Sequence, residues 1–276
     1  MKIVILLFSV LITVYGKEAH KKKEDVTCDG VYLHGKFHRK EVLSNGVNRP
    51  YQLSYYNNTV FFSQNIGDDK KDTFEIAYVR HGQMMPEAIN KTTNGFATTV
   101  DRKHELIYFG GSDGVYVHNF KEPGEIKHII KYHDIWDMFF YKHLYFIVYP
   151  SLRLHKKVGD IIEIIEHIQE KIFQFAVDGD DDIFITTRDG LYEIKNGTSE
   201  RILYEGPKIF RALEVNHDGV AFFCGQNAIY IADKEKYKLE VVAHIRNVFG
   251  LTFDDDNNMI YSNPHEIIRL LPEDCK

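Results

Sequence analysis

The chain has 276 residues, of which 44% are hydrophobic and 27% are charged, so it is long enough to bury a sizeable core. Its 34 basic and 40 acidic side chains give a formal net charge of −6. This balance excludes a general role in binding nucleic acids or acidic membranes, because those partners require a basic surface.

The N-terminus has the pattern of a secretory signal peptide. Lys2 precedes an apolar run from Ile3 to Val14, which is followed by Tyr15 and the small residue Gly16. The run is too short to span a membrane. We expect cleavage after Gly16, a charged tail over residues 17–27 and a single domain over residues 28–276. Three glycosylation sequons, at Asn57, Asn90 and Asn196, support an extracellular location.

A strand pattern recurs six times along the chain. The segments begin at Tyr51, Phe96, Trp136, Phe173, Arg211 and Phe249, at spacings of 45, 40, 37, 38 and 38 residues. Their first, third and fifth residues are mostly large and apolar, whereas the second and fourth are mostly small or polar, which is typical of strands that stack face to face. Further short apolar runs complete each unit. A fixed period of about forty residues predicts a six-bladed β-propeller.

Two stretches allow more than one interpretation. Five isoleucines between Asp160 and Ile172 could lie on one side of a helix, but their β-branched side chains and the surrounding repeat favour a strand. Asp178, Asp180 and Asp182 resemble a calcium loop, yet Ile183 stands where that loop needs glycine. A hairpin turn is therefore expected there.

The way the ring closes predicts a role for two of the three cysteines. The sixth unit ends with only three strands, so the segment from about Val31 to Leu43 is expected to supply the fourth. That arrangement would bring Cys28 close to Cys275, and an oxidising compartment would favour a disulfide between them. Cys224 lies in an apolar run and is expected to be a buried, unreactive thiol.

One rim of the predicted propeller gathers cationic side chains. The loops that enter the inner strands carry Asn48, Asn94 and Asn247 together with cations, and Arg188 and His265 lie in other loops of that face. We predict a mouth for an anionic small molecule, in which aromatic rings stack on the ligand. Ordinary solvated loop residues remain the alternative. The predicted ligand-binding residues are Arg49, Tyr51, His133, Trp136, Lys171, Lys208, Arg211 and Arg246.

The sequence contains no motif typical of a zinc site, a nucleophile elbow or a phosphate-binding loop. Hydrolytic six-bladed propellers hold a metal on their axis with acidic and amide side chains. Asp137, Glu214, Gln52 and Gln174 could play that part here, but they do not form a repeated set at one depth. We therefore expect neither a metal nor another cofactor.

Several motifs resemble the ommochrome-binding proteins of moth and butterfly haemolymph. They are CDGV from Cys28, HRKEVL from His38, NRPYQL from Asn48, NGFATTVD from Asn94, GGSDGVY from Gly110, IRNVFGL from Ile245 and the tail that ends in Cys275. The resemblance runs from about Cys28 to the C-terminus and is weaker over residues 149–172. It implies a secreted, non-enzymatic carrier of tryptophan-derived phenoxazinone pigments or their precursors.

The resemblance and the cationic rim point to the same ligand chemistry. Ommochromes are flat aromatic acids, which would bind between stacking rings and cations. Two other functions stay open at this point. One is a metal-dependent lactonase or esterase, which axial calcium and chelator-sensitive activity would favour. The other is an extracellular protein-binding module, which an exposed apolar patch on the rim would favour.

Overall fold

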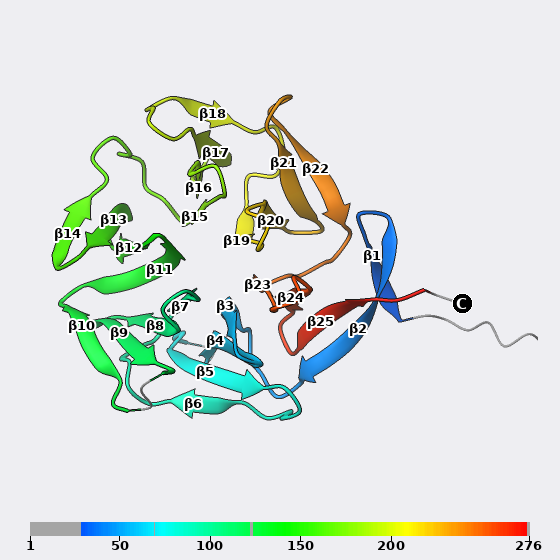
Figure 1. The fold of residues 1–276 in the computed structure, drawn as a ribbon, viewed down its shortest axis with the longest axis horizontal. Helices are drawn as coiled ribbons and strands as arrows, with labels where there is room; N and C mark the ends of the chain where they lie inside the picture. The colour runs from blue at the N-terminus through cyan, green and yellow to red at the C-terminus, as the bar shows by residue number, and fades with distance from the viewer. Residues whose placement is uncertain (1–28, 69, 122–123, 275–276) are drawn as a thin grey trace, which may run out of the picture.

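A computed structural model describes residues 29–68, 70–121 and 124–274. Within these ranges the chain forms six antiparallel sheets around a central axis, which confirms the predicted six-bladed β-propeller (Figure 1). In the same ranges, no helix is long and apolar enough to cross a membrane. The predicted signal peptide and tail lie outside the described residues, as do Cys28 and Cys275.

Five blades each consist of four consecutive strands, with the first strand nearest the axis. Blade 1 contains β3 (Tyr51–Tyr56), β4 (Thr59–Asn65), β5 (Phe74–Arg80) and β6 (Glu87–Ile89). Blade 2 contains β7 (Ala97–Asp101), β8 (Leu106–Gly111), β9 (Gly114–Asn119) and β10 (Lys127–Lys131). Blade 3 contains β11 (Asp134–Tyr141), β12 (His143–Tyr149), β13 (Arg153–Val158) and β14 (Ile161–Ile164). Blade 4 contains β15 (Gln174–Val177), β16 (Ile183–Thr186), β17 (Leu191–Ile194) and β18 (Arg201–Leu203). Blade 5 contains β19 (Phe210–Val215), β20 (Ala221–Gly225), β21 (Ile229–Asp233) and β22 (Lys238–Ala243).

Blade 6 closes the ring with strands from both ends of the described chain. Its strands, from the axis outward, are β23 (Gly250–Phe253), β24 (Met259–Ser262), β25 (Ile267–Pro272), β2 (Lys36–Ser44) and β1 (Gly30–Leu33). Strand β2 pairs antiparallel with β25, and the Arg269 guanidinium contacts the Glu41 carboxylate across this junction at 2.6 Å. The predicted closure by the N-terminal strand is confirmed (Figure 1).

The core lies between neighbouring blades, as the alternating pattern predicts. The central apolar residues of the inner strands are buried, with Leu53, Phe175 and Leu251 each 2% exposed. The small side chains of Ala97 and Ala176 on the opposite face allow the next sheet to approach closely. The blades therefore pack in the same way around the axis, with large side chains of one sheet against small side chains of the next.

The stretch from Asp160 to Ile172 is a strand followed by a loop. Residues Ile161–Ile164 pair with β13 as the outermost strand of blade 3. The chain then turns back, and Ile168 and Ile172 insert into the core with no measurable exposure. The expected strand is confirmed, and the isoleucines serve two different environments instead of one helical face.

The cysteine in blade 5 is free and fully buried in β20. Burial raises the pKa of the Cys224 thiol well above its usual range, because the charged thiolate loses its hydration. The thiol is therefore buried and unreactive at neutral pH, as predicted.

The three aspartates that resemble a calcium loop form the hairpin between β15 and β16. The Lys234 ammonium, supplied by blade 5, contacts the carboxylates of Asp178, Asp180 and Asp182 at 2.5, 2.9 and 2.6 Å. Burial alone would lower the pKa of Lys234, but hydrogen bonds to the aspartates raise it above its usual range. The aspartate cluster of blade 4 is thus joined to blade 5 through the Lys234 ammonium.

Replacing Lys234 by Met should lower the free energy of unfolding by about 2 kcal/mol, because it leaves two largely buried aspartates without their cation. Urea denaturation measures this loss. The matched control is Lys236→Met: Lys236 is largely exposed and pairs only with Asp233, so its loss should cost under about 0.5 kcal/mol. Equal losses in the two variants would contradict the bridging role.

Candidate functional site

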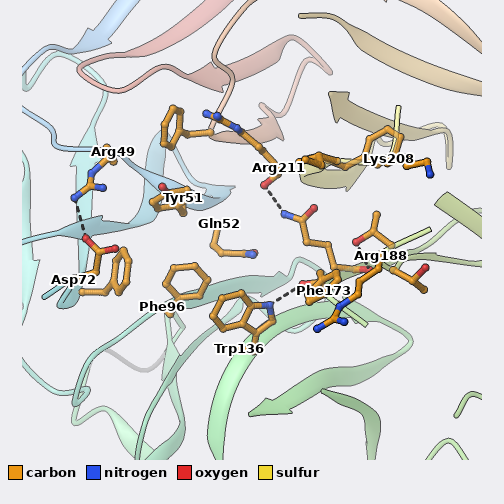
Figure 2. A pocket seen from close by; sticks show the side chains of 17 residues that line it. Arg49, Tyr51, Gln52, Asp72, Phe96, Trp136, Phe173, Arg188, Lys208 and Arg211 are labelled. Carbon is orange, nitrogen blue, oxygen red and sulfur yellow. Dashed lines mark hydrogen bonds and ion pairs between the residues drawn. The ribbon is translucent and has the colours of Figure 1, made fainter. Parts of the chain in front are cut away.

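The predicted rim surrounds a cavity of about 900 Å³ at the end of the propeller axis. All six blades contribute to its wall, through the first residues of the inner strands and the loops between second and third strands (Figure 2). We call this cavity the mouth. It is lined by Arg49, Tyr51, Gln52, Asp72, Phe74, Phe96, Trp136, Phe173, Gln174, Thr186, Thr187, Arg188, Lys208, Ile209, Phe210, Arg211 and Phe249.

The even-numbered blades present phenylalanine to the mouth. Phe96, Phe173 and Phe249 each precede an inner strand, and the backbone N–H of each donates a hydrogen bond to the second strand of its own blade. The shared hydrogen bond fixes all three residues at the same height around the axis. Their rings therefore line the wall at every second blade.

The odd-numbered blades differ because their inner strands are irregular at this point. The pairing register shifts between Tyr51 and Ser54 in blade 1, around Trp136 in blade 3 and around Arg211 in blade 5. Gln52 also has a left-handed backbone, with φ of 51°, which is uncommon for a residue other than glycine. Bulges of this kind redirect side chains and cluster beside functional sites. Here they direct Gln52, Trp136 and Arg211 to the mouth.

One side of the mouth is an aromatic surface. The Phe96 and Trp136 rings stack with centroids 5.1 Å apart, and the Tyr51 ring lies 5.8 Å from that of Phe96 and 5.0 Å from that of Phe249. The Trp136 indole N–H donates to the carbonyl of Phe173 at 2.7 Å, which fixes its orientation. This side is therefore a pre-formed surface for a flat ring system.

The other side of the mouth is cationic. Arg188 and Lys208 both lie on the right-hand side of the view in Figure 2, and neither forms an ion pair with any residue the structure describes. The Arg211 guanidinium stacks on the Phe249 ring at 4.6 Å and likewise has no carboxylate partner within the described ranges. Arg49 differs, because Asp72 neutralises it at 3.0 Å. The unpaired charges of Arg188 and Lys208 therefore lie towards blades 4 and 5, whereas that of Arg211 lies over the Phe249 ring of blade 6.

The structure brings five of the eight predicted ligand-binding residues together and leaves three away from the wall. Those on the wall are Arg49, Tyr51, Trp136, Lys208 and Arg211. His133 packs against Phe146 and His155 instead. Lys171 and Arg246 are exposed, because the neighbouring Ile172 and Ile245 are buried and anchor their loops in the opposite direction.

Sequence reasoning did not name several wall residues as ligand-binding. Arg188 was expected on this rim, but Phe74, which begins β5, and Thr187, which lies in the loop between β16 and β17, were not. Gln174 was considered only as a possible metal ligand. The loops between second and third strands follow no strict spacing in the sequence. Only their place on the same rim as the loops that enter the inner strands could have indicated these residues.

A second, small cavity lies on the axis directly beneath the mouth. It has a volume of about 20 Å³, and Asp137, Glu214, Gln52 and Gln174 all line it. We call it the axial cavity. All four side chains line this cavity, but Gln52 and Gln174 also line the mouth, and Glu214 also lines a cavity at the opposite rim. They therefore share a cavity without forming a repeated set at one depth, as expected.

Both axial carboxyl groups are poorly compensated. Burial raises the pKa of Asp137 and of Glu214 to about 8, although backbone N–H groups of Phe175 and Val215 act in the opposite direction. Neither group forms an ion pair within the described part of the chain. At neutral pH both carboxyls are therefore mostly protonated.

The comparisons with known proteins support the resemblance seen in the motifs. No family model matches the chain. The chain is similar to the ommochrome-binding protein of Manduca sexta, with 28% identity over 253 residues that cover 89% of this chain and 92% of that protein. The predicted resemblance to the ommochrome-binding proteins is confirmed by this similarity.

Solved structures share the fold at much lower identity. A gluconolactonase from Xanthomonas campestris superimposes with a TM-score of 0.70 and 10% identity, over 90% of this chain and 96% of that one. A streptogramin B lyase superimposes with a TM-score of 0.61 and 12% identity, over 86% and 98% of the two chains. At such identities the likeness concerns the propeller fold and carries no activity.

Proposed function

We propose that this protein is a secreted, non-enzymatic carrier that binds an ommochrome-type pigment, or a precursor of one, in the mouth. The observation that carries the proposal is the division of the wall into an aromatic side and an unpaired cationic side. A flat aromatic acid satisfies both sides at once, because its rings stack on Phe96 and Trp136 while its carboxylate meets the cations. The name of the Manduca sexta relative supports the same ligand class.

The composition of the wall supports binding without catalysis. It includes no histidine, cysteine or serine that could act as a nucleophile or general base. Its one carboxylate, Asp72, is engaged by Arg49 and by Asn65. Secretion and the three sequons complete the proposal, and Asn57, Asn90 and Asn196 are all exposed.

A metal-dependent hydrolase is the second candidate, and the axial cavity is the observation in its favour. Asp137 and Glu214 with two glutamine amides could supply oxygen ligands to a hard cation there. Calcium content of the purified protein, together with lactonase activity that a chelator removes, would favour this function over the carrier.

The direct test is the visible absorption spectrum of the protein purified from its native fluid, followed by titration of the stripped protein with xanthommatin. We expect a co-purifying chromophore, or a saturable one-to-one spectral shift. A colourless protein whose addition leaves the xanthommatin spectrum unchanged would contradict the proposal.

Trp136 should report binding in the mouth, because it is the only tryptophan of the chain and stacks within the wall. We expect xanthommatin to quench its fluorescence saturably, with the same dissociation constant as the spectral shift. Replacing Phe96 by Leu should weaken both signals by removing the ring that stacks on the indole. Saturable pigment binding that leaves the tryptophan emission unchanged would place the ligand elsewhere.

A further inference from the structure

The axial cavity adjoins the mouth. Gln52, Gln174 and Arg211 line both cavities, so they form a shared boundary between them. Figure 2 shows Gln52 near the centre of the mouth, among Tyr51, Phe96 and Trp136, with Arg211 higher in the view. A group attached to a ligand in the mouth can therefore reach the axial cavity past these three side chains.

The axial cavity is rich in oxygen atoms, and its donors are the Gln52 amide and the protons that the two carboxyls carry until a cation displaces them. Its carboxyl oxygens belong to Asp137, which is 4% exposed, and to Glu214. Gln174 adds a buried side-chain oxygen that has no hydrogen-bond partner among the described residues, while its amide nitrogen donates to the Arg211 carbonyl. Buried acceptors without donors are costly. The arrangement fits a guest that brings donors and positive charge.

No positively charged side chain of the described residues forms an ion pair with the axial carboxyls, so a cation could do so. Arg211 borders it, but its guanidinium is stacked on Phe249. Arg102 approaches Glu214 from the opposite rim and is held by Asp255 at 2.7 Å. The remaining lining from β7 and β23 is uncharged, with Thr98, Thr99 and Leu251.

The size of the axial cavity restricts the guest to one small group. A volume of about 20 Å³ accommodates a single water-sized group, and a primary ammonium has about that size. An ammonium also offers three donors, which matches the two carboxyls and the glutamine oxygen.

We propose that the axial cavity binds the α-ammonium group of the ligand whose aromatic part occupies the mouth, so that the ligand is an aromatic α-amino acid or a pigment that carries one. Arg211 borders both cavities, so it can hold the carboxylate while the ammonium on the same carbon enters below. This inference rests on the proposed function. It specifies that the flat aromatic acid carries an ammonium and a carboxylate on the same carbon.

The test compares 3-hydroxykynurenine with the same molecule lacking its α-amino group, with xanthommatin as the reference for the mouth. We expect the wild-type protein to bind the amino compound at least about tenfold more tightly, as for other hydrogen bonds to charged groups. In the Asp137→Asn/Glu214→Gln double variant this preference should fall to about one, and affinity for the desamino compound should not change. The retained affinity is the control for folding, and the wild-type comparison needs no variant.

The possible outcomes separate this inference from the proposed function. If xanthommatin binds but the wild-type protein does not prefer the amino compound, the ammonium subsite is overturned and the carrier function stands. A preference that survives in the double variant, or that EDTA removes from the wild-type protein, would also overturn it. If xanthommatin does not bind either, the proposed function itself fails.

Discussion

Replacing Arg211 and Lys208 together by Ala should weaken xanthommatin binding by at least about 100-fold, because each hydrogen bond to a charged group contributes about 1.5–3 kcal/mol. Both side chains line the mouth, and neither has a carboxylate partner within the described part of the chain. Their charge is therefore available to the ligand without breaking an existing ion pair. Spectral titration at fixed ionic strength measures the loss.

The structure offers a matched control for this double variant. Arg246 is an exposed cation that was expected on the same rim but does not line the mouth. Arg246→Ala should change affinity by no more than about twofold, because solvent and salt screen its charge. An equal loss in Arg246→Ala would mean that general attraction, and not contact within the mouth, binds the pigment.

Replacing Asp137 by Asn, or Glu214 by Gln, should stabilise the ligand-free protein at alkaline pH. The folded-state pKa of each carboxyl is about 8, above the ordinary values of 3.8 and 4.5. Between pH 4 and 8 the folded state therefore holds protons that the unfolded state releases, so stability falls as the pH rises through this window. Above pH 8 the folded protein carries two poorly hydrated charges, on the buried Asp137 and the partly buried Glu214, and the neutral amides avoid that cost.

The size of this effect is on the order of a few kcal/mol per site, because a tenfold change in proton affinity corresponds to about 1.4 kcal/mol. Urea midpoints at pH 5 and pH 9 measure it, and we expect the gain over the wild-type protein at pH 9 to exceed the gain at pH 5. The control is Asp160→Asn, which alters a fully exposed carboxyl and should shift neither midpoint. A gain that is the same at both pH values would contradict the buried-charge explanation.

The fold was predictable because it depends on a pattern that each blade carries in its own residues. The starts predicted at Phe96, Phe173 and Phe249 lie one residue before β7, β15 and β23. Alternation of large and small side chains is a local property, and its sixfold recurrence sets the architecture. Closure by the N-terminal strand followed from the missing fourth strand of the last unit.

The site was less predictable because its geometry depends on register. The residue type at Gln52, Trp136 or Arg211 does not reveal that the strand bulges there, since a bulge is a mismatch between two paired strands. The same limit applies to Asp137, whose direction follows the bulge that precedes it. Likewise, Lys234 lies 52 to 56 residues from its three aspartates, so no local sequence motif indicates these ion pairs.

The closure of blade 6 also sets when the protein becomes able to bind. Strand β2 is made early, but its partner β25 is made last, and the Glu41–Arg269 contact joins residues 228 positions apart. Contacts of such long range form late in folding, because the loop they close is expensive in chain entropy. The mouth draws on all six blades, so a nascent chain has no partial version of it. The complete mouth therefore forms only when the ring closes, at the end of folding.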